Sequence, residues 1–194
     1  MITIDEITIV VDGREIIYDY SEQIPAGSIT VIVGPNGCGK STLLAAIAGD
    51  IAPDKGTITI DEHHPILTAA NTLAGIRSMV VQNQSFVLGF TVRQVIEMAG
   101  DSAHVMKALE LTEIADRLVT TLSGGEAQRV AIAQAIAQNT PVLLLDEPLA
   151  AQDVHSRGRI ITLLKDLAEQ GKTIVVVAHS NETELSWADK VIKQ

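Results

Sequence analysis

The sequence is poor in aromatic residues and has a single cysteine. Trp, Tyr and Phe together make up 3% of the 194 residues, and Cys38 has no second thiol with which to pair. An internal disulfide is therefore excluded, and the lone thiol agrees with a reducing cytoplasm. The core must instead be built from aliphatic side chains, and hydrophobic residues are 46% of the chain.

Positive charge and long apolar runs are also scarce. The 14 Lys and Arg are scattered and are outnumbered by 24 Asp and Glu, which gives a formal net charge of −10. Nucleic-acid surfaces depend on clustered positive charge, so we expect no nucleic-acid partner. No apolar run approaches the roughly 18–20 residues that cross a bilayer. The first residues also lack the basic and apolar segments of a signal peptide.

One glycine-rich stretch lies between an apolar run at 28–33, a predicted strand, and an apolar run at 43–48, a predicted helix. Its order fits the phosphate-binding pattern G-x-x-x-x-G-K-[ST]. Glycines let the backbone curl so that several N–H groups face one anion, and the helix N-terminus adds a positive dipole end. The stretch predicts a site for a nucleoside triphosphate, formed by Gly34, Pro35, Asn36, Gly37, Cys38, Gly39, Lys40, Ser41 and Thr42.

The polar side chains of this stretch have distinct expected tasks. Lys40 would reach the β- and γ-phosphates, and the Ser41 hydroxyl would bind Mg²⁺.

Two acidic residues follow a second buried strand. The apolar run 141–145 is typical of a parallel strand covered on both faces, and it ends at Asp146 and Glu147. Ligands of open α/β sheets bind at this end of the strands. We therefore expect Asp146 to hold Mg²⁺ and Glu147 to polarise the attacking water. His179 ends another apolar run, but a lone histidine at a strand end is more often structural than catalytic.

A glycine-flanked helix start follows at Ser123, Gly124 and Gly125. Ser123 and Glu126 have the spacing of a capping box, and an apolar-periodic helix follows them. The same arrangement is also an anion site, so a structural and a binding role are both open.

The rest of the pattern predicts an α/β chain. Asp12-Gly13 offers a hairpin turn between β-branched runs, and 57–60 is expected to join the same antiparallel ribbon. Helical spacing is expected at 91–98, 105–118, 160–167 and 185–191.

His63 and His64 are neighbours on an extended segment and would point to opposite faces. A solvated loop is favoured there over a metal site, because no second ligand cluster lies nearby in the sequence.

Taken together, these motifs resemble the ATP-binding subunit of ABC transporters over nearly the whole chain. They occur in the family's order as the phosphate loop 34–42, Gln82, Leu122–Glu126, Leu145–Pro148 and His179. The resemblance implies one domain, 1–194, with a P-loop NTPase core and a mostly parallel sheet. It also implies an N-terminal antiparallel β subdomain and an α-helical subdomain inserted at about 92–138.

The resemblance implies an ATPase in which two such domains, here a homodimer, sandwich two ATP molecules head to tail. Lys40, Ser41 and Asp146 would come from one subunit. Asp153 would lie in the loop that crosses the dimer interface. The γ-phosphate would be capped by the other subunit's signature residues, Ser123, Gly124 and Gly125.

The resemblance also assigns the catalytic roles. Glu147 would be the general base, and Lys40 would contact the phosphates. Gln82 would sense Mg²⁺ and the lytic water. His179 would contact the γ-phosphate and position that water. The resemblance therefore favours a catalytic role for His179, whereas its place at a strand end alone favours a structural one.

Several residues depart from the family's pattern. Val11 stands near the position where an aromatic residue usually stacks on adenine, which predicts weaker adenine affinity and base selectivity. Glu126 replaces the commoner glutamine, and Leu149 and Gln152 differ from the usual residues around Asp153. Since none of these changes removes a group that does chemistry, we expect an active hydrolase.

The resemblance implies a separate transmembrane permease, contacted largely near Gln82 to Arg93. It also allows a solute-binding protein as a further partner. The chain would then be cytoplasmic and peripheral on the inner face of the membrane. Ala115-Asp116-Arg117 and its surroundings are similar to ATPases of importers for metal ions, siderophores, haem and cobalamin. The alternative is a soluble ABC ATPase that acts as a mechanical or assembly module.

Overall fold

The computed structural model describes residues 1–82, 86–87, 89–179 and 185–194. Within these residues, a five-stranded sheet has the order β5-β6-β7-β3-β8. All of its pairings are parallel. The sheet therefore brings the carboxyl ends of its strands to one edge, as the sequence predicts. Its members are β3 (Ile29–Val33), β5 (Arg77–Val80), β6 (Val142–Asp146), β7 (Thr173–Ala178) and β8 (Lys190–Lys193).

A second, antiparallel sheet has the order β2-β1-β4. It consists of β1 (Ile2–Val11), β2 (Arg14–Ile24) and β4 (Lys55–Ile60). The predicted hairpin turn is confirmed, and both Asp12 (φ 51°) and Gly13 (φ 76°) have the positive φ of a primed two-residue turn. The pairing of β4 with β1 confirms the expected third strand.

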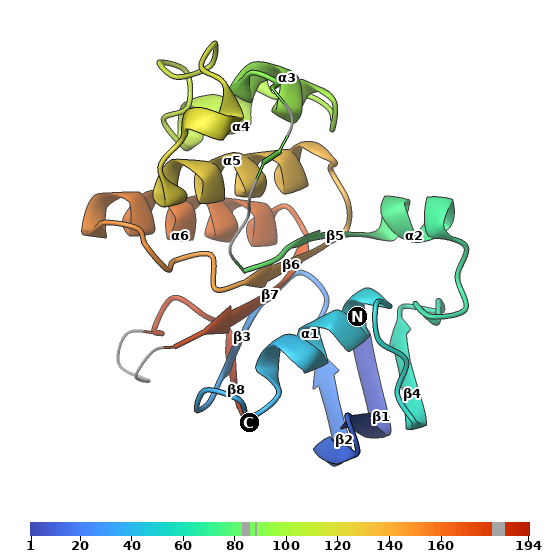
Figure 1. Cartoon of the computed structure of the whole chain (residues 1–194). Helices are drawn as coiled ribbons and strands as arrows, with labels where there is room; N and C mark the ends of the chain where they lie inside the picture. Colours follow the sequence, from blue (N-terminus) through green and yellow to red (C-terminus); the bar gives the residue numbers. More distant parts are fainter. Residues whose placement is uncertain (83–85, 88, 180–184) are drawn as a thin grey trace.

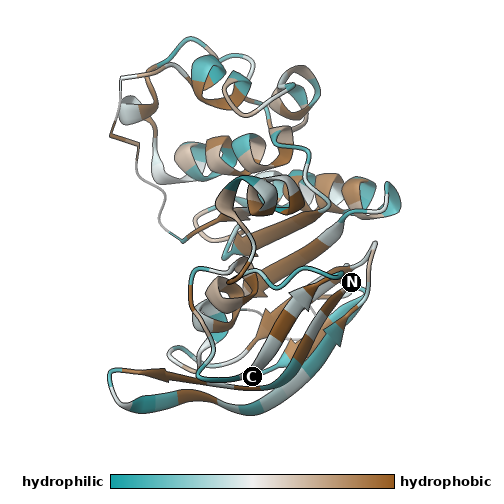
Figure 2. Cartoon of the chain, turned by 90° about the vertical axis from the view of Figure 1, so that its right-hand side faces the viewer, coloured by the Kyte–Doolittle hydropathy of each residue, from teal (hydrophilic) through white to brown (hydrophobic). Residues whose placement is uncertain are grey.

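Helix α1 (Lys40–Ala48) lies between the two sheets (Figure 1). Its residues Leu43, Leu44 and Ile47 are fully buried, and they share one apolar cluster with inward-facing residues of the antiparallel sheet. Figure 2 shows hydrophobic residues along both sheets where they face each other across this layer. The same cluster contains Val142 and Leu144 of β6, so α1 is packed on both sides.

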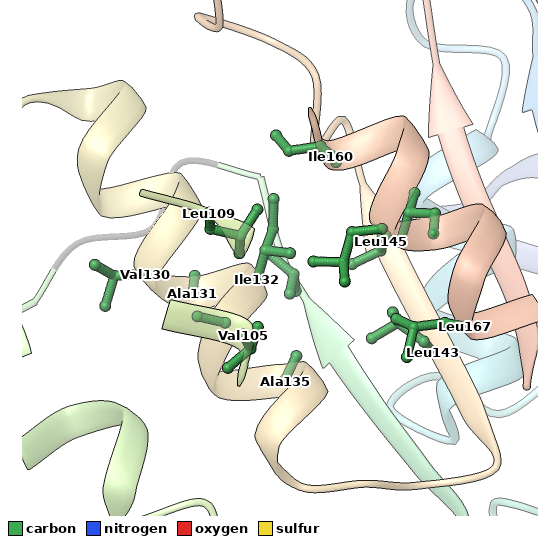
Figure 3. Close-up of a cluster of buried hydrophobic side chains, with 14 of the residues drawn as sticks. Val105, Leu109, Val130, Ala131, Ile132, Ala135, Leu143, Leu145, Ile160 and Leu167 are labelled. Atoms are coloured by element: carbon green, nitrogen blue, oxygen red, sulfur yellow. The ribbon is translucent and has the colours of Figure 1, made fainter. Parts of the chain in front are cut away.

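The opposite face of the parallel sheet supports a second apolar cluster. Alternate residues of β6, Leu143 and Leu145, point to this side, as the period of two in a strand requires. They pack against α5 (Gly124–Ala137) and α6 (Val154–Glu169), as Figure 3 shows. The segments α3 (Val92–Glu97), α4 (Ala103–Ala108) and η1 (Val119–Thr121) lie beyond α5 (Figure 1).

Two helix predictions need correction, and a third is confirmed but extended. The expected helix at 185–191 is wrong, because a turn at 185–188 leads into β8, which pairs with β3. The helix expected over 105–118 is only α4, since the chain leaves helical geometry at Glu110 (φ 54°). Helix α6 begins well before residue 160, because Asp153 caps its N-terminus.

Helix α2 (Ala70–Ile76) is not indicated by apolar periodicity, and only Leu73 of it is buried. Of the expected permease-contact segment 82–93, residues 83–85 and 88 lie outside the described residues.

Among the described residues, no helix combines the length and the hydropathy that crossing a bilayer requires.

The seat of α5 on the sheet can be tested at Ile132, which is fully buried in the second cluster. Ile132→Ala should lower the free energy of unfolding by about 2–5 kcal/mol, because the cavity adds to the lost transfer free energy. Ile132→Val, the matched control, should cost about 0.5–1.5 kcal/mol. Urea unfolding at neutral pH measures both. Equal losses for the two variants would contradict this packing.

Candidate nucleotide site

The phosphate loop leaves the carboxyl end of β3 and enters α1 through residues with positive φ. Gly37 (φ 80°) and Gly39 (φ 102°) adopt the left-handed conformation, and Gly39 is the N-cap of α1. A Cβ atom on Gly39 would lie 2.8 Å from Cγ2 of Ile16 in β2. Glycine is thus required there by both backbone conformation and space.

The Lys40 ammonium is turned back into the loop. Its Nζ donates to the carbonyl oxygens of Gly34 and Pro35, each at 2.9 Å, and the residue is only 5% exposed. Among the described residues, it forms no salt bridge with a carboxylate. A buried cation whose hydrogen bonds go only to neutral carbonyls can accept an anion, and a phosphate would supply one.

Asp146 ends β6 near Lys40 and Ser41. It is 5% exposed, and its Oδ1 has no hydrogen-bond partner among the described residues. Burial raises the pKa of this carboxyl, and a hydrogen bond from Ser41 and the charge of Lys40 act in the opposite direction. An unpartnered carboxylate oxygen beside a serine hydroxyl is the donor chemistry that Mg²⁺ takes, so these residues fit that ion.

Glu147 follows in a strained backbone conformation (φ 50°), with its N–H donating to the carbonyl of Val177 at 3.1 Å. The Gln82 amide donates from Nε2 to Oε2 of Glu147 at 2.7 Å. His179 contacts the other carboxylate oxygen through Nε2. The ends of β5, β6 and β7 thus bring together Gln82, Glu147 and His179, three residues far apart in the sequence.

Gln82, Glu147 and His179 line one pocket of about 430 Å³. Val11, at the end of β1, is 39% exposed and lines this pocket beside the phosphate loop. The position thus has an aliphatic side chain where the family resemblance predicts an aromatic one. Ile16 is a lining residue that sequence reasoning missed, because only the fold of the hairpin over the loop brings it there. The other lining residues are Asn36, Gly37, Gly39, Lys40, Ser41 and Thr42.

The signature turn lies elsewhere. Ser123 caps α5, and the predicted capping box is confirmed: Oγ accepts from the Glu126 N–H (3.3 Å), and Glu126 Oε2 accepts from the Ser123 N–H (2.7 Å). The hydrogen bond from the Ser123 backbone lowers the pKa of Glu126, and Arg117 contributes through its own contact at 2.8 Å. Ser123 and Gly124 are exposed.

Asp153 is also exposed, and it caps α6 by accepting from the Ser156 N–H at 2.8 Å. This backbone hydrogen bond is the main cause of its lowered pKa. The described residues that line the nucleotide pocket do not include Asp153, Ser123, Gly124 or Gly125. The structure therefore does not bring these four residues to the pocket of their own chain.

His63 and His64 are both exposed, and the described residues contain no group of three or more His, Cys, Asp and Glu able to hold a metal. Residues 61–64 form a turn with an isolated bridge from Ile60 to His63, which agrees with the loop expected there.

The chain was also compared with known families, proteins and solved structures. The family model described as ABC transporter matches residues 17–150. The chain is 37% identical to the hemin import ATP-binding protein HmuV of Rhodococcus jostii, over 97% of this chain and 69% of that protein. It is 39% identical to the cobalamin import ATP-binding protein BtuD of Halobacterium salinarum over 93% of its length, but spans only 49% of that relative.

Among solved structures, the chain is similar to the dimeric ATP-binding cassette MJ0796, whose post-hydrolysis state holds ADP and Pi. The TM-score is 0.87 at 28% identity, with 100% of this chain and 94% of that chain covered. The match includes the parallel sheet, the antiparallel sheet and the helices described above. The chain therefore belongs to the ABC transporter family, as an ATP-binding cassette subunit that hydrolyses ATP.

Proposed function

We propose that this chain works as a homodimer that powers a separate membrane permease, and that the complex imports a metal chelate of the haem or cobalamin class. The Gln82–Glu147–His179 cluster beside Lys40 carries the catalytic part of the proposal. The solute class rests on the likeness to the hemin and cobalamin import proteins. In this arrangement the chain is cytoplasmic and lies on the inner face of the membrane through the permease.

In the proposed reaction, the phosphate loop 34–42 holds the triphosphate and Lys40 binds its terminal phosphates. Ser41, Asp146 and Gln82 would hold Mg²⁺, which supplies charge neutralisation when bound. A water oxygen bonds to the γ-phosphorus, and the bond from that phosphorus to the β–γ bridging oxygen breaks. The electron pair leaves with ADP.

Glu147 accepts the proton of that water. Gln82 and His179 hold its carboxylate from either side, so its remaining lone pairs have a fixed direction. In this reaction His179 would also contact the γ-phosphate.

The signature residues complete the partner's site rather than their own. Ser123, Gly124 and Gly125 form a helix N-terminus outside the pocket that contains Lys40, and Ser123 and Gly124 are exposed there. A head-to-tail dimer resolves this separation by placing them on the γ-phosphate bound to the other subunit, with Asp153 at the interface. Residues 92–138 would form the inserted helical subdomain of the single domain 1–194.

Exposed apolar side chains at and near the segment 82–93 are the proposed contact with the permease. We call the permease patch the side chains of Val81 (45% exposed), Val87 (86%), Phe90 (37%), Met98 (63%) and Leu118 (45%). The backbone joins two of its parts, because the Val119 N–H donates to the Phe90 carbonyl at 2.9 Å. The patch overlaps the segment 82–93 expected from the sequence.

The permease contact is tested by capturing the tagged chain from gently solubilised membranes and identifying its partners by mass spectrometry. Wild type should recover a multi-spanning protein, whose type identifies the solute class. Leu118→Glu should lose most of it, because a carboxylate would be desolvated in an apolar interface. Ile66→Glu is the matched control, since Ile66 is 46% exposed outside the patch. Recovery of cytosolic partners alone would favour the soluble mechanical or assembly module.

The dimer is tested with Glu147→Gln. This variant should lose about 10²–10⁴-fold in kcat, because the general base is removed while the phosphate contacts remain. It should form a dimer on addition of ATP and Mg²⁺, measured by analytical ultracentrifugation. Adding Lys40→Ala to the same variant should abolish ATP binding and the dimer together. Normal turnover by Glu147→Gln would show that Glu147 is not the base.

The adenine contact is tested at Val11. Val11→Tyr should tighten ATP binding about 2- to 12-fold, the effect of about 0.5–1.5 kcal/mol of aromatic stacking. Val10→Tyr is the control, because Val10 is similarly exposed (37%) but does not line the pocket. Isothermal titration calorimetry gives both dissociation constants. Equal constants for the two variants would place adenine away from Val11.

A further inference from the structure

A buried amide joins the signature turn to the loop that follows Glu147. Gln152 is 6% exposed, and its Nε2 donates to the Gly125 carbonyl at 3.1 Å. Its Oε1 accepts from Nη1 of Arg129 at 3.1 Å, one turn along α5. Both ends of the amide are therefore satisfied, and both hydrogen bonds go to the helix that begins at the signature turn.

The network continues into the start of α6. The same Arg129 Nη1 lies 3.4 Å from Oγ of Ser156, and that hydroxyl donates to Oδ2 of Asp153 at 3.0 Å. Gln152 and Asp153 are neighbours in the chain, so α5 holds this part of the loop through both of them. We call this set the Gln152 clamp: Gly125, Arg129, Gln152, Asp153 and Ser156.

The loop itself is short and strained. It begins at Glu147 (φ 50°) and includes Ala151 (φ 57°), both left-handed without being glycine. The Ala150 N–H donates to the Glu147 carbonyl at 3.1 Å, which closes a tight turn. Residues in such conformations persist only where their surroundings determine them.

The two backbones also approach each other closely at this point. A Cβ atom on Gly125 would lie 3.0 Å from the carbonyl oxygen of Ala151. The turn 123–125 therefore cannot shift toward the loop 147–153 without moving it, since packed backbones do not compress.

We propose that Gln152 is a positioning residue that couples the two ATP sites of the dimer, an inference that rests on the proposed head-to-tail dimer. The turn 123–125 faces the partner's ATP, whereas Glu147 serves the ATP of its own chain. The clamp links the turn 123–125 to the loop 147–153. When the turn binds the partner's γ-phosphate, the clamp therefore fixes the position of the loop that carries Glu147. An apolar side chain at 152 would fill the space but break this link.

The experiment measures steady-state ATP hydrolysis as a function of ATP concentration for wild type and Gln152→Leu. Wild type should show a Hill coefficient above one, since two coupled sites act together. Gln152→Leu should lower kcat about 10- to 100-fold, the range that a misplaced catalytic group produces, and bring the Hill coefficient to one. The dissociation constant of ATP for the monomer should stay unchanged.

Two further variants separate positioning from packing. Gln128→Leu is the matched control: Gln128 is a buried glutamine (7% exposed) of α5, and its Nε2 has no partner among the described residues. This variant should keep the wild-type Hill coefficient. Gln152→Glu keeps the acceptor for Arg129 but loses the donor to Gly125, so it should behave like Gln152→Leu. It also carries the test if Gln152→Leu fails to fold.

The outcomes distinguish this inference from the proposed function. A cooperative wild type with a Gln152→Leu or Gln152→Glu variant of unchanged Hill coefficient would overturn the role of Gln152 alone. A wild type that neither dimerises with ATP nor shows cooperativity would overturn the proposed dimer, and the clamp's role with it. If Gln128→Leu also lost cooperativity, the loss would come from disturbed packing of α5, and the proposed role of Gln152 would be overturned.

Discussion

The carboxyl edge of the parallel sheet holds a buried cation and a buried carboxylate that form no salt bridge with each other. Lys40 is held by two carbonyl oxygens, and Asp146 keeps one oxygen without a partner among the described residues. Removing such groups from water costs several kcal/mol for each ion, which neutral carbonyls or a single hydroxyl only partly offset. A phosphate chain with its counter-ion would satisfy both groups. The protein's own side chains leave these two groups without a full set of partners, and a bound ligand would supply the missing ones.

The two apolar clusters keep these groups in place. One cluster fixes α1 from both sides, so the Lys40 end of that helix cannot tilt away from the sheet. The other fixes β6 and β7 under α5 and α6, and these strands carry Asp146, Glu147 and His179. Because strand residues alternate between the clusters, β6 and β7 contribute to both layers while their ends stay free for chemistry. Aliphatic packing alone achieves this in a chain with few aromatic side chains.

The polar cluster at the sheet edge could be anticipated because its members end buried strands. Gln82, Asp146, Glu147 and His179 each follow an apolar run, and parallel strands bring such ends together. The capping box at Ser123 is a local rule, and it too was predictable. The segment 185–191 was not, because its apolar residues serve the edge of β3 rather than a helix face. Spacing in one segment does not say which partner covers it.

The nearest contacts of Gln152 and Ile16 were beyond sequence reasoning for a related reason. Gln152 differs from the family's usual residue, yet nothing in its neighbourhood in the sequence shows that its amide reaches Gly125. Ile16 meets Gly39 only because the hairpin folds over the loop. Both contacts join segments that are far apart in the sequence, and no sequence motif pairs these segments. Only the three-dimensional structure shows that they meet.

The place of β3 in its sheet has a consequence for how the protein is made. The strand that precedes the phosphate loop is completed early, at residues 29–33, but its two neighbours are β7 at 173–178 and β8 at 190–193. During synthesis, the antiparallel sheet and α1 can assemble long before those partners leave the ribosome. Pairing across so much chain is slow, and unpaired strand edges are prone to aggregation. The nucleotide loop therefore gains its rigid support only after β7 and β8 have been synthesised, and a nascent chain that stalls earlier would expose β3.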